Sequence, residues 1–160
     1  MIVLSPLLSK TEEEMFLRAK VQLIQYHYSY ALACGIDDSE IRDYDLLSAR
    51  NSMIGRENFL VKLDNIPVGM VQYQITKSAL DDANIVFVHS LYICDEFQNK
   101  GIAYWLLRQL FLMYANHRIE CECWYSIPAE VQYEKIGFRT LYSRLFINEE
   151  DLRLGPKLDI

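Results

Sequence analysis

The fold of this chain is decided by residues 85–103, IVFVHSLYICDEFQNKGIA. The first part, Ile85 to Ile93, is a nearly continuous apolar run, which is typical of a central strand covered on both faces. Polar and acidic residues follow, and after Gly101 the apolar residues return at helical spacing. The segment therefore predicts a buried strand, a loop and the beginning of a helix.

The loop from Asp95 to Ala103 predicts an anion site. A helix that begins directly after a loop leaves backbone N–H groups without partners at the positive end of its dipole. Gly101 lets a phosphate approach the backbone, Ala103 keeps the first turn unobstructed and Lys100 adds a positive charge. A P-loop and a dinucleotide-binding fingerprint are excluded because both need further glycines. An ordinary strand-to-helix connection remains the alternative interpretation.

Before this segment, the sequence predicts two helices and a hairpin. Thr11 and Glu14 have the spacing of a capping box. The helix that follows carries an apolar stripe and ends at Gly35; the stripe consists of Leu17, Val21, Ile24, Tyr28 and Ala31. Asp38 or Ser39 caps a second, short helix through residues 46–47. Strands at 59–63 and 68–75 are joined by a tight turn at 64–65.

After the segment, we expect a helix, a strand, a second helix and a last strand. The first helix is indicated by apolar residues at helical spacing, namely Ile102, Leu106, Leu110 and Met113. A strand at 119–123, a short helix from about Pro128 and a strand at 138–146 complete the pattern. No internal repeat or linker interrupts the chain, so residues 1–160 are expected to form a single domain. The charged tail after about Asn148 is expected to be loosely held.

Composition limits the classes of function. The 160 residues are 51% hydrophobic and 24% charged, with a net charge of −6, which indicates a globular domain and disfavours nucleic acid as the main partner. The sequence contains no run of 18 apolar residues, so no membrane span is predicted. Met1 to Leu8 do not resemble a secretory signal. The four cysteines lack zinc spacing, so we expect reduced thiols, no metal and a cytoplasmic location.

Two motifs together resemble the GCN5-related N-acetyltransferases. Residues 98–103, QNKGIA, resemble the acetyl-CoA motif of that family, Q/R-x-x-G-x-G/A, and follow the apolar strand as in the family. About thirty residues later, residues 133–138, YEKIGF, resemble the second motif, Y-E-K-x-G-F. The resemblance covers residues 59–146. Three positions depart from the family pattern: Ala103 replaces a glycine, Ser126 replaces an asparagine, and Gln132 replaces an aromatic residue.

The resemblance implies a single α/β (α+β) domain. Its central sheet would be mixed, mostly antiparallel and twisted, with helices on both faces and splayed central strands. The backbone of Leu91, Tyr92 and Ile93 would pair with the pantetheine arm of acetyl-CoA, and the Ile93 N–H would polarise the thioester carbonyl. Ser126 would contact the same arm. The pyrophosphate would lie on the backbone of the loop, that is on Gln98, Asn99, Lys100, Gly101, Ile102 and Ala103.

The resemblance also implies catalytic roles. Tyr133 would protonate the departing thiolate, although a packed ring with a bonded hydroxyl is the structural alternative. His89 is a candidate for the base that accepts the amine proton, and a purely structural histidine is as well supported. Glu122 is the second candidate for the base, with a solvated strand face as its alternative. Residues 26–30, YHYSY, can line an acceptor pocket or belong to the core.

The predicted function is an acetyl-CoA-dependent N-acetyltransferase acting on a primary amine of a small molecule or peptide. The alternative is a non-catalytic acyl-CoA-binding sensor or partner module of the same fold. Tyr133 and the loop around Gly101 favour the enzyme, whereas Ser126 favours the alternative. We expect no metal, membrane or nucleic-acid partner, and a homodimer is compatible with the sequence.

Overall fold

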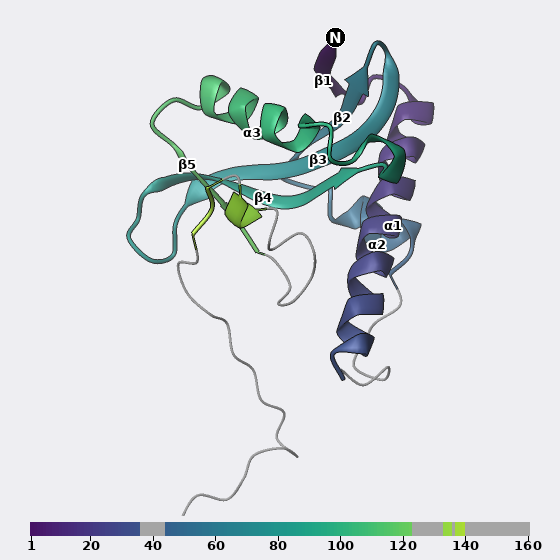
Figure 1. The fold of residues 1–160 in the computed structure, drawn as a ribbon, viewed down its shortest axis with the longest axis horizontal. Helices are drawn as coiled ribbons and strands as arrows, with labels where there is room; N and C mark the ends of the chain where they lie inside the picture. Colours follow the sequence, from purple (N-terminus) through teal and green to yellow (C-terminus); the bar gives the residue numbers. More distant parts are fainter. Residues whose placement is uncertain (36–43, 123–132, 136, 140–160) are drawn as a thin grey trace, which may run out of the picture.

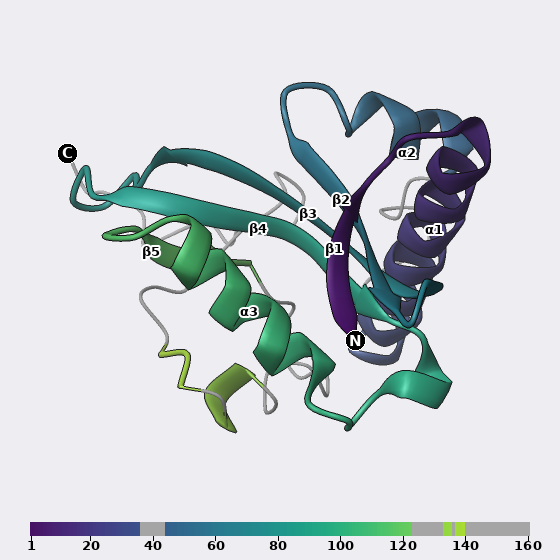
Figure 2. The same ribbon diagram turned by 90° about the horizontal axis from the view of Figure 1, so that it is seen from above.

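The computed structural model describes residues 1–35, 44–122, 133–135 and 137–139. Its elements are, in order, β1 (Ile2–Pro6), α1 (Lys10–Ala33), α2 (Leu46–Asn51), β2 (Glu57–Leu63), β3 (Ile66–Lys77), β4 (Asn84–Ile93), the 3-10 turn η2 (Asp95–Phe97), α3 (Ile102–Met113) and β5 (Arg118–Cys121). Figure 1 shows α3 lying along the sheet, and Figure 2 shows α1 and α2 together, away from α3. In the part of the chain that the structure describes, no helix is long and apolar enough to cross a bilayer.

The sheet is mixed and mostly antiparallel, as predicted. Its strand order is β1-β2-β3-β4-β5, with three antiparallel pairings followed by a parallel pairing of β4 with β5. The predicted hairpin is formed by β2 and β3. Asp64 and Asn65 at its turn have positive φ angles of 49° and 68°, the backbone conformation that a two-residue hairpin turn requires. The strand predicted at Ile85 to Ile93 is β4, and it lies inside the sheet between β3 and β5.

The first strand was not predicted from the sequence. Ile2–Pro6 pairs antiparallel with β2, from Ile2 opposite Leu63 to Pro6 opposite Phe59. The expectation that the first element is a helix is therefore wrong, because β1 precedes α1. Pro6 can end this strand because β1 lies at the edge of the sheet, where no further ladder needs its missing N–H.

Helix α1 begins two residues earlier than predicted. Its N-cap is Ser9, whose Oγ accepts from the Glu12 N–H at 3.2 Å, and Glu12 Oε2 accepts from the Leu8 N–H at 2.9 Å. The capping box therefore consists of Ser9 and Glu12, and the prediction of Thr11 with Glu14 is wrong. Both pairs fit the pattern, and Ser9 prevails because it also accommodates the extended backbone of the cap.

The end of α1 agrees with the prediction, whereas the cap of α2 differs. Gly35 follows the last turn of α1 with a φ angle of +88° and donates to the Leu32 carbonyl. Helix α2 is capped by Asp45, whose Oδ1 accepts from the Ser48 N–H at 2.8 Å. Asp38 and Ser39, the predicted caps, lie outside the described residues.

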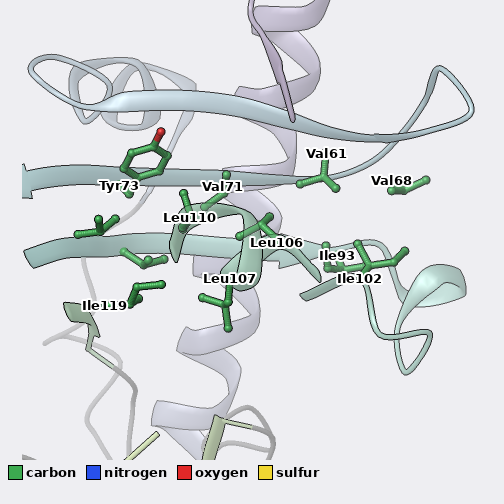
Figure 3. Close-up of a cluster of buried hydrophobic side chains, with 12 residues drawn as sticks. Val61, Val68, Val71, Tyr73, Ile93, Ile102, Leu106, Leu107, Leu110 and Ile119 are labelled. Carbon is green, nitrogen blue, oxygen red and sulfur yellow. The ribbon is translucent and has the colours of Figure 1, made fainter. Parts of the chain in front are cut away.

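One face of the sheet is covered by α3. The predicted stripe of this helix is buried at Ile102, Leu106 and Leu110, whereas Met113 in the last turn is exposed. Figure 3 shows these side chains pointing towards residues of β3, β4 and β5. The cluster consists of Val61, Val68, Val71, Tyr73, Val86, Val88, Ile93, Ile102, Leu106, Leu107, Leu110 and Ile119. This is the larger apolar core of the molecule.

The opposite face of the sheet is covered by α1. Phe16 and Leu23 of α1 pack with Leu60 of β2 and Met70 of β3 in a second, smaller core. Helices therefore cover both faces, as predicted. The buried side of α1 nevertheless differs from the predicted stripe, since of that stripe only Leu17 and Ala31 are buried. Lys20 is buried on the same side of α1 as these apolar residues.

Strand β4 contains a β-bulge at His89. Gln72 of β3 pairs with Ser90, and the next residue, Tyr73, pairs with Val88, which leaves His89 as the extra residue. The parallel pairing of β4 with β5 ends at the same place, because its last pair is Val88 with Cys121. The remaining residues of β4 are thus paired with β3 alone among the described strands, and the splay of the central strands stays a prediction.

Some predicted elements lie outside the described residues. This holds for the beginning of the helix from Pro128, for nearly all of the strand at 138–146 and for the tail after Asn148. Residues 133–135 are helical, which agrees with the predicted helix.

At Gly69, the neighbouring strand β4 leaves no room for a side chain. A Cβ atom on Gly69 would lie 2.3 Å from the Tyr92 carbonyl oxygen and 2.8 Å from Cδ1 of Ile93. We expect Gly69→Ala to lower the free energy of unfolding by about 1–3 kcal/mol, because neither strand can yield without disturbing the ladder. Urea denaturation measures this change. Ile66→Ala, at an exposed position of the same strand, is the control and should leave the midpoint nearly unchanged. A Gly69→Ala protein as stable as the parent would contradict this account.

Candidate functional site

The predicted loop and helix N-terminus are present in the structure. Gly101 is the N-cap of α3 and has a left-handed φ angle of +76°, and no side chain caps the helix. Its carbonyl accepts from the Trp105 N–H at 2.9 Å, so the helix is regular from its first turn. Among the described residues, the backbone N–H groups of 99–104 have no acceptor. The site can therefore hold an anion at the positive end of the α3 dipole.

The side chain of Gln98 fixes the shape of this loop. Its Nε2 donates to the Ile93 carbonyl at 2.9 Å and to Asp95 Oδ1 at 2.8 Å. The next residue, Asn99, has a left-handed φ angle of 58°, and Lys100 Nζ lies 5.2 Å from the centre of the Phe97 ring. The loop is thus held by its own residues, and its backbone rather than the Gln98 side chain is left to bind a ligand.

The backbone of β4 differs from residue to residue in what it can bind. The Cys94 N–H donates to the Val68 carbonyl at 2.9 Å, which makes Gly69 and Ile93 a non-hydrogen-bonded pair of the antiparallel ladder. By the alternation of that ladder, the backbone groups of Ile93 and Leu91 point away from β3, whereas those of Tyr92 point towards it. Leu91 and Ile93 can therefore bind a ligand through their backbone, and Tyr92 can offer its side chain.

His89 lies at the bulge, on the α1 side of the sheet. Its Nε2 is 3.4 Å from Gln74 Oε1, and its ring packs edge-on against Phe87 at 4.9 Å between centroids. Burial, together with the positive charges of Arg56 and Lys20, lowers the pKa of His89 to about 4. The ring is therefore neutral at neutral pH. It can accept a proton, but its proton affinity is low.

Beside His89 lies a buried polar cluster that sequence reasoning missed. Lys20 of α1 donates to Gln72 Oε1 and, at 3.3 Å, to Ser90 Oγ. Arg56 Nη1 donates to the same oxygen of Gln72 at 3.0 Å. The Gln72 Nε2 donates to Asn58 Oδ1 at 2.7 Å and to the carbonyl of Ser52. The sequence signal that could have identified Lys20 is its helical spacing from Phe16 and Leu23, which places all three on one face of α1. The predicted stripe did not include this face.

Lys20 is an unusual residue for a helix core. Only 3% of its surface is exposed, and burial, followed by the charge of Arg56, lowers the pKa of its ammonium group to about 8. A buried ammonium is normally compensated by a carboxylate. Among the described residues, neither Lys20 nor Arg56 forms a salt bridge.

Tyr133 is the first described residue of the helical segment 133–135. The centre of its ring lies 5.2 Å from that of Phe138, and its carbonyl accepts from the Phe138 N–H at 3.0 Å. Phe138 in turn packs against the α3-side core, so this segment is anchored on the face opposite to His89. Gly137 makes the intervening turn with a φ angle of +104°.

The other predicted residues lie at different places. Glu122 is exposed and directly follows β5. Ser126 lies outside the described residues. Tyr26 and Tyr30 form an aromatic pair with centroids 4.9 Å apart, and their hydroxyl groups are hydrogen bonded, which raises the pKa of Tyr26 to about 12. Since Tyr26 is substantially exposed, it is not a core residue and remains a candidate for lining the acceptor side.

The chain is similar to known acetyltransferases in sequence pattern. Residues 55–140 match the family model described as an acetyltransferase (GNAT) domain. The match spans β2 to the Tyr133 segment and so includes both motifs. The comparison with curated proteins gives no match.

The fold is shared with solved structures. An aminoglycoside antibiotic 6'-N-acetyltransferase from Acinetobacter baumannii is 12% identical with a TM-score of 0.66, over 97% of this chain and 100% of that chain. The aminoglycoside acetyltransferase AAC(6')-Iy, solved with a bisubstrate analogue of CoA, is 16% identical with a TM-score of 0.63, over 93% of this chain and 97% of that chain. A ribosomal-protein-alanine N-acetyltransferase from Brucella melitensis is 18% identical with a TM-score of 0.57, over 92% of this chain and 97% of that chain. The fold prediction is confirmed.

The backbone at Gly101 provides a test of the cofactor site. We expect Gly101→Glu to abolish the rise in melting temperature that acetyl-CoA causes, because a side chain and a negative charge would occupy the N-terminus of α3. Gly55→Glu is the matched control, since Gly55 also has a positive φ, of +72°, and has no atom near its Cβ position. Both variants should lose about 1–2 kcal/mol of stability through backbone strain, but only Gly101→Glu should lose the ligand effect. A normal ligand-induced shift in Gly101→Glu would refute the location of the phosphate site.

Proposed function

Because the chain belongs to the GNAT acetyltransferase family, we propose that it transfers the acetyl group of acetyl-CoA to a primary amine in the cytoplasm. One observation carries the proposal: the edge of β4 beyond Val88, which pairs with no other described strand on that side, leads directly into the N-terminus of α3, which no described side chain caps. The first of these surfaces suits an amide-containing chain and the second suits a pyrophosphate. Their order along the molecule is that of the pantetheine arm and the pyrophosphate in acetyl-CoA.

In this proposal, backbone groups bind the cofactor. The pyrophosphate accepts hydrogen bonds from the loop at residues 98–103, and Lys100 adds a positive charge nearby. The pantetheine amides pair with the backbone of Leu91 and Ile93, which faces away from β3. Since the Ile93 carbonyl already accepts from Gln98, the Ile93 N–H is the group left to polarise the thioester.

The chemical step is an acyl transfer. The neutral amine nitrogen attacks the thioester carbon, and the electron pair of the carbonyl moves to its oxygen, where the Ile93 N–H stabilises the charge. The C–S bond then breaks, the carbonyl re-forms as an amide, and the thiolate of CoA leaves with a proton. The nitrogen loses one proton to a base.

Tyr133 is the proposed acid. A phenolic hydroxyl carries a proton that it can donate to a departing thiolate. The packing of its ring against Phe138 holds the side chain on the α3 side of the sheet. The proton therefore reaches the sulfur from the face opposite to the α1-side cluster.

His89 is the proposed base, and Glu122 is the alternative. His89 lies one residue before Ser90 and two before Leu91, so it adjoins the expected thioester. Its pKa near 4 leaves it unprotonated throughout the neutral range, as a base must be, while limiting its strength. Glu122 follows the end of β5, on the other side of the splay.

The alternative function is a non-catalytic acyl-CoA-binding module. Loss of the family asparagine at Ser126 is the sequence feature that favours it. Thiol release from acetyl-CoA with a panel of primary amines distinguishes the two. An enzyme releases CoA thiol and yields an acetylated amine, whereas a sensor shows ligand-induced stabilisation without amine-dependent thiol release.

We expect Tyr133→Phe to lower kcat and kcat/KM together, by about 10²–10⁴-fold, because the hydroxyl acts when charge develops on sulfur. Acetyl-CoA affinity should be unchanged. Tyr114→Phe is the control: it removes a hydroxyl that lies 3.0 Å from that of Tyr73, so it should reduce stability without lowering kcat. Steady-state kinetics and calorimetry measure these effects. Full activity of Tyr133→Phe would exclude the acid role while leaving the family unchanged.

The pH profile tests the base. If His89 accepts the proton, kcat/KM of the parent falls as the pH falls through about 4, where the ring becomes protonated. His89→Ala should lower kcat/KM by about 10²–10⁴-fold above that pH and remove the limb, with acetyl-CoA affinity unchanged. Glu122→Gln should keep the parent profile. The reverse result, in which Glu122→Gln loses activity and His89→Ala does not, would move the role to Glu122.

A further inference from the structure

Two positively charged side chains, Lys20 and Arg56, share one hydrogen-bond acceptor atom. Both donate to Oε1 of Gln72, a residue that is fully buried in the sheet. Lys20 reaches this atom from inside the protein, whereas Arg56 lies at the end of the turn before β2 and is partly exposed. Like charges this close together repel each other, and a neutral amide oxygen compensates neither of them.

The guanidinium of Arg56 retains unused donors. In the described part of the chain its only hydrogen bond runs from Nη1 to Gln72, although the group carries five N–H bonds in a planar fork. Such a fork matches the two oxygens of a carboxylate. Arg50 and Lys62, in contrast, each form a salt bridge with a glutamate. Of these four described cations, only Lys20 and Arg56 lack a carboxylate partner among the described residues.

The cluster adjoins the expected site of acetyl transfer. Lys20 contacts Ser90, which immediately precedes Leu91, the first residue expected to bind the pantetheine arm. Arg56 and Lys20 both act on the imidazole of His89 at the β4 bulge. A ligand that binds Arg56 therefore lies on the α1 side of the sheet, next to the residue proposed to accept the amine proton.

We propose that the acceptor amine also carries a carboxylate, or a similar anionic group, that binds the Arg56 guanidinium with Lys20 behind it. This inference rests on the proposed function, because it names the class of amine that the enzyme acetylates. Arg56 provides the hydrogen bonds, and Lys20 contributes charge through the shared Gln72 oxygen. The acceptor is then an amino acid or a related zwitterion. The solved aminoglycoside acetyltransferases are named for a different class of acceptor.

The test compares amines that differ only in charge at the far end. The probes are linear ω-amino acids of increasing length, their carboxamides and the unsubstituted alkylamines. We expect kcat/KM to be about 10–100-fold higher for the ω-amino acid than for the carboxamide at the best length, since one charge-assisted contact contributes that much. In Arg56→Met and Lys20→Met this ratio should fall towards one, whatever the change in the absolute rate with either amine.

Two control variants remove a cation of the same kind elsewhere. Arg50→Met and Lys62→Met each break a carboxylate pair, and they should keep the preference for the ω-amino acid. Without ligand, Lys20→Met and Arg56→Met should be at least as stable as the parent, because each relieves the repulsion. A parent without preference for the carboxylate, or a preference that survives in both Lys20→Met and Arg56→Met, would overturn the inference.

A binding measurement separates this inference from the proposed function. Calorimetric titration of the same ω-amino acids and carboxamides into the protein with CoA present needs no turnover. If no amine is acetylated but Arg56-dependent carboxylate binding is found, the proposed function fails and the anion site stands. If amines are acetylated and the carboxylate binds no better than the carboxamide, the function stands and the anion site is wrong.

Discussion

Strand β4 pairs with β3 along its length, whereas among the described residues its pairing with β5 ends at Val88, and the proposed site depends on this difference. The bulge at His89 lies at the same point of β4, and its one extra residue changes which side chains face α1 and which backbone groups face outward. Beyond the bulge, Leu91 and Ile93 offer their backbone to a ligand, and Ser90 turns towards Lys20. A single inserted residue thus lies between the proposed cofactor edge and the proposed acceptor side.

The two faces of the sheet have different electrostatic characters. The α3 face is apolar up to the loop, where the helix N-terminus provides partial positive charge from the backbone. The α1 face carries full positive charges on Lys20 and Arg56, close to His89. An ammonium group beside these cations is disfavoured relative to the neutral amine, so an acceptor nitrogen bound there loses its proton more readily than in water. In the proposed reaction, a weak base such as His89 is then sufficient, because the cluster would lower the proton affinity of an acceptor bound beside it.

The sequence predicted the elements whose signals are local. Alternation, the Asp64-Asn65 turn and the helical spacing after Gly101 each depend on neighbouring residues, and the hairpin, β4 and α3 were found. Strand β1 was missed because its only reason to be extended is pairing with β2, some sixty residues away. The bulge and the Lys20 cluster were missed for the same reason. The bulge arises from the register between β3 and β4, and the cluster arises from the packing of α1 on those strands. The loop could be located from the sequence. The direction of the Ile93 backbone groups, however, follows only from the hydrogen-bond pattern between β3 and β4.

A cofactor site made of backbone places few demands on side chains. The solved acetyltransferases that share this fold are only 12–18% identical to the chain, yet they cover more than nine-tenths of it. The proposed site needs a strand edge open to a ligand, a helix N-terminus and a glycine that can adopt positive φ, and the described residues provide these at β4, α3 and Gly101. The side chains on the α1 face are under no such constraint. The choice of acceptor can therefore change through residues such as Lys20 and Arg56 without any change in how the acetyl donor is held.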